Sequence, residues 1–244
     1  MDQRILLLTG ASRGIGHATG KLFADAGWRV VTVSRHAFSP RCPWLGGPEN
    51  HVQLDLGNLD DIEAGLTELR NRLPDGRLDA LVNNAGISPK GPEGARLGVL
   101  DSPYATWLRV FSVNLFSTAL LAKGLIRHLA EAKGSIVNVT SIAGTRVHPY
   151  AGAAYAGSKA ALLSLTREMA AEFAPLGVRT NAISPGEIDT AILSPGTAAF
   201  ADREVPMRRL GKPAEVASAI YFLCSEAASY VNGAELHING GQHV

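Results

Sequence analysis

The sequence predicts an α/β protein built on one doubly wound parallel sheet of about seven strands, with helices on both faces. Two observations predict this class. Short apolar runs alternate with longer amphipathic segments, which is the pattern of right-handed βαβ units. Several apolar runs are continuous, as expected for parallel strands covered on both faces. The 244 residues contain no repeat or linker, so we expect a single domain spanning residues 1–244.

The strands and helices are expected in alternation. The apolar runs predict strands at Arg4–Thr9, Arg29–Ser34, His51–Leu54, Leu78–Val82, Ser135–Thr140, Val178–Ile183 and Ala234–Ile238. The amphipathic patterns predict helices at Ile15–Ala26, Leu59–Leu73, Pro103–Ala132, Gly152–Ala174 and Pro213–Ser225.

Residues that favour helix ends mark several of these boundaries. The first helical pattern closes at Gly27, which suits the left-handed position after a helix. Asn58 is a favourable N-cap for the second helix. Ser102 is expected to cap the third, with Pro103 at its first helical position. The fourth pattern stops before Pro175, which cannot continue a helix.

Three stretches are expected to be loops because they are rich in Pro and Gly or weak in periodicity. They are Arg41–Asn50, Ser88–Ser102 and Asp189–Pro206. Long loops at the carboxyl ends of strands often build the substrate pocket of such a fold.

Charge and hydropathy argue against two classes of partner. The 23 Lys and Arg nearly balance the 22 Asp and Glu, giving a net charge of +1. This balance argues against a basic surface for nucleic acid and against a polybasic membrane anchor. No apolar run approaches the length of a bilayer span, and Ile5–Leu8 is too short for a signal-peptide core. We therefore expect a soluble, cytoplasmic protein.

The two cysteines, Cys42 and Cys224, cannot form a disulfide framework. Neither belongs to a CxxC pair, so no cysteine-based zinc site is expected. Reduced thiols in a cytosolic protein are the better interpretation, and no metal site is predicted.

A glycine-rich segment, Thr9–Gly16, follows the first strand and opens the first helix. Glycines permit a tight turn and close approach to a pyrophosphate, which the helix N-terminus then binds. A Walker A loop is excluded, because Leu22 stands where it needs Ser or Thr and Ile15 where it needs its first glycine. A glycine loop alone also fits an ordinary strand-to-helix turn. In this position it favours a dinucleotide site.

The choice of cofactor follows from the end of the second strand. An NAD site usually places an acid there to bond the ribose 2′-hydroxyl, and Ser34–Phe38 contains none. Arg13 and Arg35 could instead hold a 2′-phosphate with planar donors. Either arginine alone would be an ordinary surface charge. Together with the missing acid they favour NADP(H) over NAD(H).

Three side chains point to proton chemistry. Tyr155 and Lys159 are four residues apart on a predicted helix and share one face. An ammonium near a phenol lowers its pKa, which would suit a general acid/base. Ser141 ends the fifth predicted strand. The helical pair alone also occurs as a surface pair, and the serine alone as a strand-end cap. In this fold both can lie at the cleft beyond the strands.

Taken together, the motifs resemble the short-chain dehydrogenase/reductase family, and within it the 3-oxoacyl-carrier-protein reductases. The residues that carry the resemblance cover nearly the whole chain: Thr9–Gly16, Asn83–Gly86, Asn114, Ser141, Tyr155–Lys159, Asn181, Pro185–Thr190, Arg209–Gly211, Pro213 and Asn239–Gly241.

The resemblance implies a Rossmann-type fold, hydride transfer between a nicotinamide cofactor and a CH–OH or C=O group, and four catalytic residues. Tyr155 would be the general acid/base, Lys159 would lower its pKa and bond the nicotinamide ribose, and Ser141 would hold the carbonyl oxygen. Asn114, in an irregular turn of its helix, would complete a proton relay. With the glycine loop and the arginines, the expected cofactor contacts are Gly10, Ser12, Arg13, Gly14, Ile15, Gly16, Ser34, Arg35, Asp55, Leu56, Asn83, Ala85, Gly86, Tyr155, Lys159, Pro185, Gly186, Ile188 and Thr190.

Three further residues are candidates for the substrate pocket. His148 and Tyr150 lie between two of the catalytic residues, where they either line a pocket or serve as ordinary loop packing. Glu187 is an unusual acid beside the expected nicotinamide site. It either orients a substrate or faces solvent, and we favour solvent.

The leading hypothesis is an NADPH-dependent reductase of a ketone or 3-oxoacyl group, or the reverse alcohol oxidation. An NAD-linked alcohol or sugar dehydrogenase is the alternative within the class. A non-catalytic nucleotide-sensing protein on the same fold is a third possibility. The resemblance also implies a homotetramer or homodimer.

Overall fold

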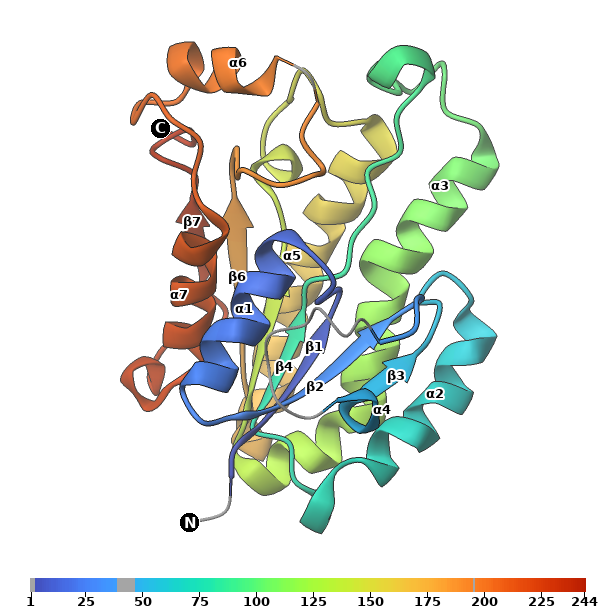
Figure 1. Cartoon of the computed structure of the whole chain (residues 1–244), viewed down its shortest axis with the longest axis vertical. Helices are drawn as coiled ribbons and strands as arrows, with labels where there is room; N and C mark the ends of the chain where they lie inside the picture. Colours follow the sequence, from blue (N-terminus) through green and yellow to red (C-terminus); the bar gives the residue numbers. More distant parts are fainter. Residues whose placement is uncertain (1–2, 39–46, 195) are drawn as a thin grey trace.

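A computed structural model of the chain describes residues 3–38, 47–194 and 196–244. Within these residues, seven strands form one sheet in the order β3-β2-β1-β4-β5-β6-β7 (Figure 1). Every neighbouring pair is parallel. The strands are β1 (Ile5–Thr9), β2 (Arg29–Ser34), β3 (His51–Gln53), β4 (Ala80–Asn83), β5 (Ser135–Val139), β6 (Arg179–Pro185) and β7 (Glu235–Ile238). From β1 the strand order runs one way to β2 and β3 and the other way to β4–β7, so the order reverses between β1 and β4. This confirms the prediction of a doubly wound, Rossmann-type sheet.

Helices cover both faces of the sheet. On one face lie α1 (Gly14–Asp25) and α7 (Pro213–Cys224), which pack against each other. On the other lie α2 (Leu59–Asn71), α4 (Ser117–Ala132) and α5 (Ala153–Phe173). The helix α3 (Tyr104–Phe111) runs into α4 through a π-helical turn, η4 (Ser112–Phe116). Short 3₁₀ turns are η1 (Pro48–Asn50), η2 (Pro74–Gly76), η3 (Pro92–Gly94), η5 (Ile142–Gly144), η6 (Ala174–Leu176) and η7 (Glu226–Ala228).

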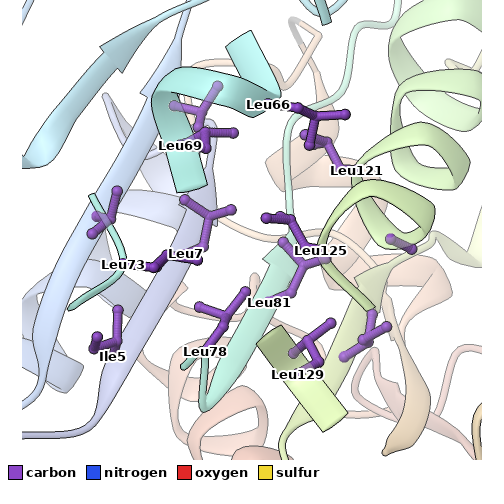
Figure 2. Close-up of a cluster of buried hydrophobic side chains, with 14 of the residues drawn as sticks. Ile5, Leu7, Leu66, Leu69, Leu73, Leu78, Leu81, Leu121, Leu125 and Leu129 are labelled. Carbon is purple, nitrogen blue, oxygen red and sulfur yellow. The ribbon is translucent and has the colours of Figure 1, made fainter. Parts of the chain in front are cut away.

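The apolar run of the central strand β1 is continuous because both faces of this strand are buried. Ile5 and Leu7 belong to the core cluster under α2, α4 and α5, whereas Leu6 and Leu8 belong to the cluster under α1 and α7. Figure 2 shows the first cluster, in which Leu7 lies among leucines of α2, β4 and α4. A buried leucine contributes about 1.5–3 kcal/mol relative to an exposed one, so both faces stabilise the sheet.

The third predicted helix differs at its start. Pro103 is extended and serves as the N-cap, and the helix begins at Tyr104. The Ser102 hydroxyl donates to the carbonyl of Gly98 at 2.6 Å and does not cap the helix. The π-helical turn places Asn114 in an irregular turn, as the family resemblance implied.

The expectation of a loop over Asp189–Pro206 is wrong in its second half. Residues Thr197–Glu204 form helix α6, and Gly196 at its N-cap adopts a left-handed conformation with φ of 83°. Thr197 and Ala201 are buried on one side of these two turns. Since Ser88–Ser102 contains only the turn η3, that stretch is a loop as predicted. Of the predicted loop Arg41–Asn50, residues 41–46 lie outside the described residues.

Two further expectations concern the cysteines and the apolar segments. Cys224 is a buried free thiol, and burial raises its pKa to about 12; Cys42 lies outside the described residues.

Contrary to expectation, the helical stretch Tyr104–Ala132 is long and apolar enough to span a membrane, with a mean hydropathy of 1.3 in its best window. Three leucines of this stretch, Leu121, Leu125 and Leu129, are fully buried in the core, and core helices also pass this test.

Candidate active site

The main cavity, of about 370 Å³, opens at the carboxyl ends of the strands. The glycine loop after β1 and the ends of β2, β4, β5 and β6 line it, together with α5. Segments far apart in the sequence therefore meet at this edge, as a doubly wound sheet requires.

The glycine loop leaves no room for side chains. A Cβ on Gly16 would lie 2.2 Å from the carbonyl oxygen of Gly10. Gly10 itself has a φ of +72° and packs against Ala85 of the β4 loop. The hydroxyl of Thr9 accepts hydrogen bonds from the backbone N–H groups of Asn84 and Ala85, both at 3.0 Å, and so fixes the two loops together.

The N-terminus of α1 faces the cavity. Arg13 is its N-cap, and Arg13, Gly14 and Ile15 all line the cavity wall. Free backbone N–H groups and the positive end of the helix dipole favour a phosphate at such a position. The loop and helix end therefore fit the pyrophosphate of a dinucleotide.

The end of β2 contributes a positive wall. Ser34 and Arg35 line the cavity together with His36, and the Ser34 hydroxyl donates to the His36 carbonyl at 2.9 Å. The Nε of Arg35 contacts Nε2 of His36 at 3.3 Å.

The acid that faces this wall is Asp55, and it is already engaged. Its carboxylate accepts two hydrogen bonds from Arg109, at 2.9 and 3.0 Å, and one from the backbone N–H of Gly57 at 2.9 Å. Burial alone would raise the pKa of Asp55, but these donors and the charges of Arg109 and Arg35 outweigh burial and lower it. The carboxylate is held ionised beside the cavity.

The candidate catalytic side chains line the same cavity. Ser141, Tyr155 and Lys159 all line it. Ser141 follows β5 and caps η5, where its Oγ accepts from the backbone N–H of Ala143 at 3.2 Å. The Nζ of Lys159 donates to the carbonyl of Val139 at 2.6 Å and lies 5.8 Å from the ring centroid of Tyr155. Burial lowers the pKa of Lys159 to about 8.

The expectation that Lys159 lowers the pKa of Tyr155 is not met in this structure. The pKa of Tyr155 is raised, because burial penalises the phenolate more than a hydrogen bond with Ser141 favours it. The negative charge of Glu187 adds to the increase. Lys159 is itself buried, so its own charge is costly there.

Asn114 lies behind the cavity wall and close to Lys159. Its Oδ1 accepts from the backbone N–H of Ile87 at 2.9 Å, and its Nδ2 donates to the hydroxyl of Ser158 at 3.0 Å. A Cβ on Gly86 would lie 3.4 Å from Lys159 Nζ and 3.5 Å from Asn114 Oδ1. Gly86 therefore leaves an open space that both polar groups border.

A second cavity, of about 90 Å³, adjoins the first. Both are lined by Ser141, Tyr155, Gly186, Ile192 and Leu193. The second also contains all three candidate substrate-pocket residues, His148, Tyr150 and Glu187.

The preference for a solvent-facing Glu187 is wrong. Its side chain is 6% exposed and that of His148 is 9% exposed, and His148 Nε2 contacts the Oε1 of Glu187. The backbone N–H of Tyr150 donates to Nδ1 of His148 at 3.3 Å, so Nε2 carries the proton that faces Glu187. The rings of His148 and Tyr150 pack edge-on against Phe200 of α6.

Most of the expected cofactor residues line the main cavity. The exceptions are Gly16, which shapes the loop, and Asn83. The side chain of Asn83 is buried and donates to Oδ1 of Asn138 at 2.9 Å, so it joins β4 to β5 inside the core.

Several cavity residues were not expected from the sequence. Arg109, His36 and Ile87 line the main cavity, and Lys90 and Ser194 line the second. Arg109 had no local signal, because its partner Asp55 lies 54 positions away. For Lys90, its place in a Gly- and Pro-rich loop at the cleft was the only clue.

Comparison with known proteins agrees with this geometry. Residues 10–243 match the family model described as Enoyl-(Acyl carrier protein) reductase. The chain is 57% identical over 244 residues to Protein FixR of Bradyrhizobium diazoefficiens, covering all of this chain and 88% of the relative. It is 35% identical to the 3-oxoacyl-[acyl-carrier-protein] reductase FabG of Vibrio cholerae, covering all of this chain and 99% of that protein.

Solved structures give the same assignment. A Brucella ovis oxidoreductase of the short chain dehydrogenase/reductase family, in complex with a partially ordered NAD, is 53% identical, with a TM-score of 0.85 over 98% of this chain and 100% of that one. A Brucella melitensis 3-oxoacyl-[acyl-carrier protein] reductase with bound NAD is 33% identical, with a TM-score of 0.88 over 100% of this chain and 92% of that one.

The fold and the cleft define a nicotinamide-dependent oxidoreductase of the Rossmann type. The chain belongs to the short-chain dehydrogenase/reductase family. It is an oxidoreductase acting on CH–OH and C=O groups.

Proposed function

We propose that the chain reduces a ketone or 3-oxoacyl group to a secondary alcohol with NADPH, or catalyses the reverse oxidation. The observation that carries this proposal is that Ser141, Tyr155 and Lys159 line the same cavity as the glycine loop. The nicotinamide cofactor supplies the hydride, and the chain supplies position and a proton.

The protein groups divide the remaining work. The Tyr155 hydroxyl gives a proton to the substrate oxygen in reduction and takes it back in oxidation. Ser141 donates a hydrogen bond to the same oxygen. Lys159 and Asn114 both border the space at Gly86, where they would continue the proton relay from Tyr155. A raised pKa keeps Tyr155 protonated at neutral pH, ready to donate.

The cofactor is proposed to lie along the main cavity. The pyrophosphate would be held by Gly10, Ser12, Gly14 and Ile15. The adenosine and nicotinamide parts would be held by residues at or after the ends of β3, β4 and β6: Asp55, Leu56, Ala85, Gly86, Pro185, Gly186, Ile188 and Thr190. Arg13 and Arg35 would hold a 2′-phosphate, which favours NADP(H).

An NAD-linked alcohol or sugar dehydrogenase is the second candidate. It is favoured by the Brucella ovis relative, whose structure carries a partially ordered NAD at 53% identity. Against it, Ser34–Phe38 contains no acid and Asp55 is held by Arg109.

We also propose that residues 1–244 act as one domain in the cytoplasm, as a homotetramer. Near-neutral charge and two isolated cysteines are compatible with that location. Strand β7 forms an edge of the sheet and is available for an interface between copies. Light scattering on the purified chain gives the mass, and a monomer would contradict this part of the proposal.

The experiment that tests the function is a panel of carbonyl compounds and alcohols followed at the nicotinamide absorbance with both cofactors. We expect turnover of at least one carbonyl class with NADPH above that with NADH. Higher kcat/KM with NADH would favour the second candidate. Cofactor binding with no turnover across a broad panel would favour a nucleotide-sensing protein.

A further inference from the structure

The second cavity is a separate compartment beside the candidate catalytic tyrosine. It adjoins the main cavity at Ser141 and Tyr155, and its lining also includes Ser194 and Thr197, the first residue of α6. A substrate whose oxygen contacts Tyr155 would therefore extend part of itself into this space.

The wall of this compartment combines aliphatic side chains, such as Ile142 and Ile192, with the buried pair His148 and Glu187, although a wholly apolar wall would cost less. Removing a carboxylate such as Glu187 from water costs several kcal/mol, and a buried pair is often no more stable than apolar side chains of similar volume. Glu187 and His148 are nevertheless both buried and paired here. Stability alone does not account for them, which points to a role in recognition.

The compartment offers both acceptors and donors. Glu187 uses Oε1 on His148, which leaves Oε2 as an acceptor. Ser194 Oγ is buried without a hydrogen-bond partner among the described residues. Lys90 donates one of its three N–H groups to the carbonyl of Tyr150, leaving two. A hydroxyl group donates and accepts at once, so it matches this mixed wall better than a methylene or a carboxylate does.

We propose that the compartment formed by Lys90, His148, Glu187 and Ser194 is a substrate subsite that selects small, multiply hydroxylated alcohols and carbonyl compounds of the polyol or sugar type. This inference rests on the proposed function, because it assumes that the reacting oxygen contacts Tyr155. A long apolar acyl chain would leave the buried carboxylate without its hydroxyl partner, and unpaired polar groups oppose such a ligand.

The test compares substrates that differ by one hydroxyl. Cyclohexanol and the cyclohexane-1,2-, 1,3- and 1,4-diols are oxidised with NADP⁺, followed at the nicotinamide absorbance. Because a hydrogen bond to a charged group contributes about 1.5–3 kcal/mol, the preferred diol should exceed cyclohexanol in kcat/KM by about 10- to 100-fold. Equal values, or a preference for cyclohexanol, overturn the subsite and leave the proposed function standing.

Variants at the cavity wall test whether Glu187 and His148 cause the preference for the diol. Glu187→Gln keeps the shape and removes the charge, and it should reduce the diol preference by about 10-fold. The double variant His148→Leu/Glu187→Leu should abolish the preference for the diol over cyclohexanol. Glu63→Gln, at an exposed position of α2, is the matched control and should keep the wild-type preference. An unchanged preference in both cavity variants overturns the assignment.

Binding supplies a measurement that does not depend on turnover. Calorimetric titration of Tyr155→Phe with NADP⁺ present should show about 10-fold tighter binding of the preferred diol than of cyclohexanol. If this difference is absent, the subsite is overturned even when wild-type turnover is normal. If the difference is present and the wild type does not turn over, the subsite stands and the proposed function fails. A chain that binds no nicotinamide cofactor overturns both.

Discussion

The imidazole of His148 hydrogen-bonds the carboxylate of Glu187, 39 positions along the chain, in a buried wall beside Tyr155. Because both side chains are buried, loss of either one would leave the other without this partner and out of reach of bulk water.

Removal of His148 alone should destabilise the protein. His148→Leu leaves the Glu187 carboxylate buried without its partner, and we expect the free energy of unfolding to fall by about 3 kcal/mol. The double variant His148→Leu/Glu187→Leu should recover most of that loss, because apolar side chains carry no desolvation cost. Urea unfolding of the wild type, both single variants and the double variant measures this. Additive losses would contradict a coupled pair.

The buried ammonium of Lys159 predicts a pH dependence of stability. Its pKa of about 8 in the folded chain lies below the ordinary 10.5, so the unfolded chain binds more protons between these values and stability rises with pH there. Relative to Lys159→Met, the wild type should gain about 2 kcal/mol in unfolding free energy between about pH 7.5 and about pH 9.5. Lys123→Met, at an exposed position of α4, should show no such gain. A flat difference between wild type and Lys159→Met would refute the lowered pKa.

The tight glycine loop predicts a contrast between two substitutions. In Gly16→Ala the new Cβ would meet the carbonyl oxygen of Gly10 at 2.2 Å, so we expect a loss of about 1–3 kcal/mol in stability and weaker cofactor binding. In Gly157→Ala the nearest atom would be 3.6 Å away, and helix propensity favours alanine by up to about 1 kcal/mol. Thermal unfolding with and without cofactor measures both. A Gly16→Ala protein as stable as Gly157→Ala would show that the loop has spare room.

The proposed choice of cofactor depends on Arg35. Arg35→Ala should weaken NADPH binding by about 10-fold or more, because this is the usual contribution of a hydrogen bond to a charged group. The affinity for NADH should change little. Fluorescence titration with both cofactors measures this, and Arg127→Ala, exposed on α4, is the control. Equal weakening of both cofactors would indicate damage to the loop and remove the argument for NADP(H).

The fold was predictable because each strand is marked by a short apolar run in its own sequence. Continuous runs such as Ile5–Leu8 bury consecutive side chains on opposite faces, and each of the seven predicted strands is present with its ends shifted by at most two residues. Helix α6 was missed because only Thr197 and Ala201 are buried in its two turns, which gives too short a pattern to recognise.

The candidate site was predictable only in part. Ser141, Tyr155 and Lys159 could be recognised from spacing and resemblance, and the structure brings them to one cavity. The environment of each group could not be predicted, since it depends on distant segments. Burial reverses the expected direction of the Tyr155 pKa, and the position of Glu187 is decided by a histidine in another loop.

In the proposed function, the phenol of Tyr155 transfers the proton to the substrate oxygen. The most direct measurement compares Tyr155→Phe with the wild type for turnover of the best panel substrate and for NADPH binding, with the exposed Tyr104→Phe as control. We predict that Tyr155→Phe loses at least about 100-fold in kcat and binds NADPH with unchanged affinity, while Tyr104→Phe behaves as the wild type. Turnover by Tyr155→Phe within a few-fold of the wild type would contradict proton transfer by the Tyr155 phenol.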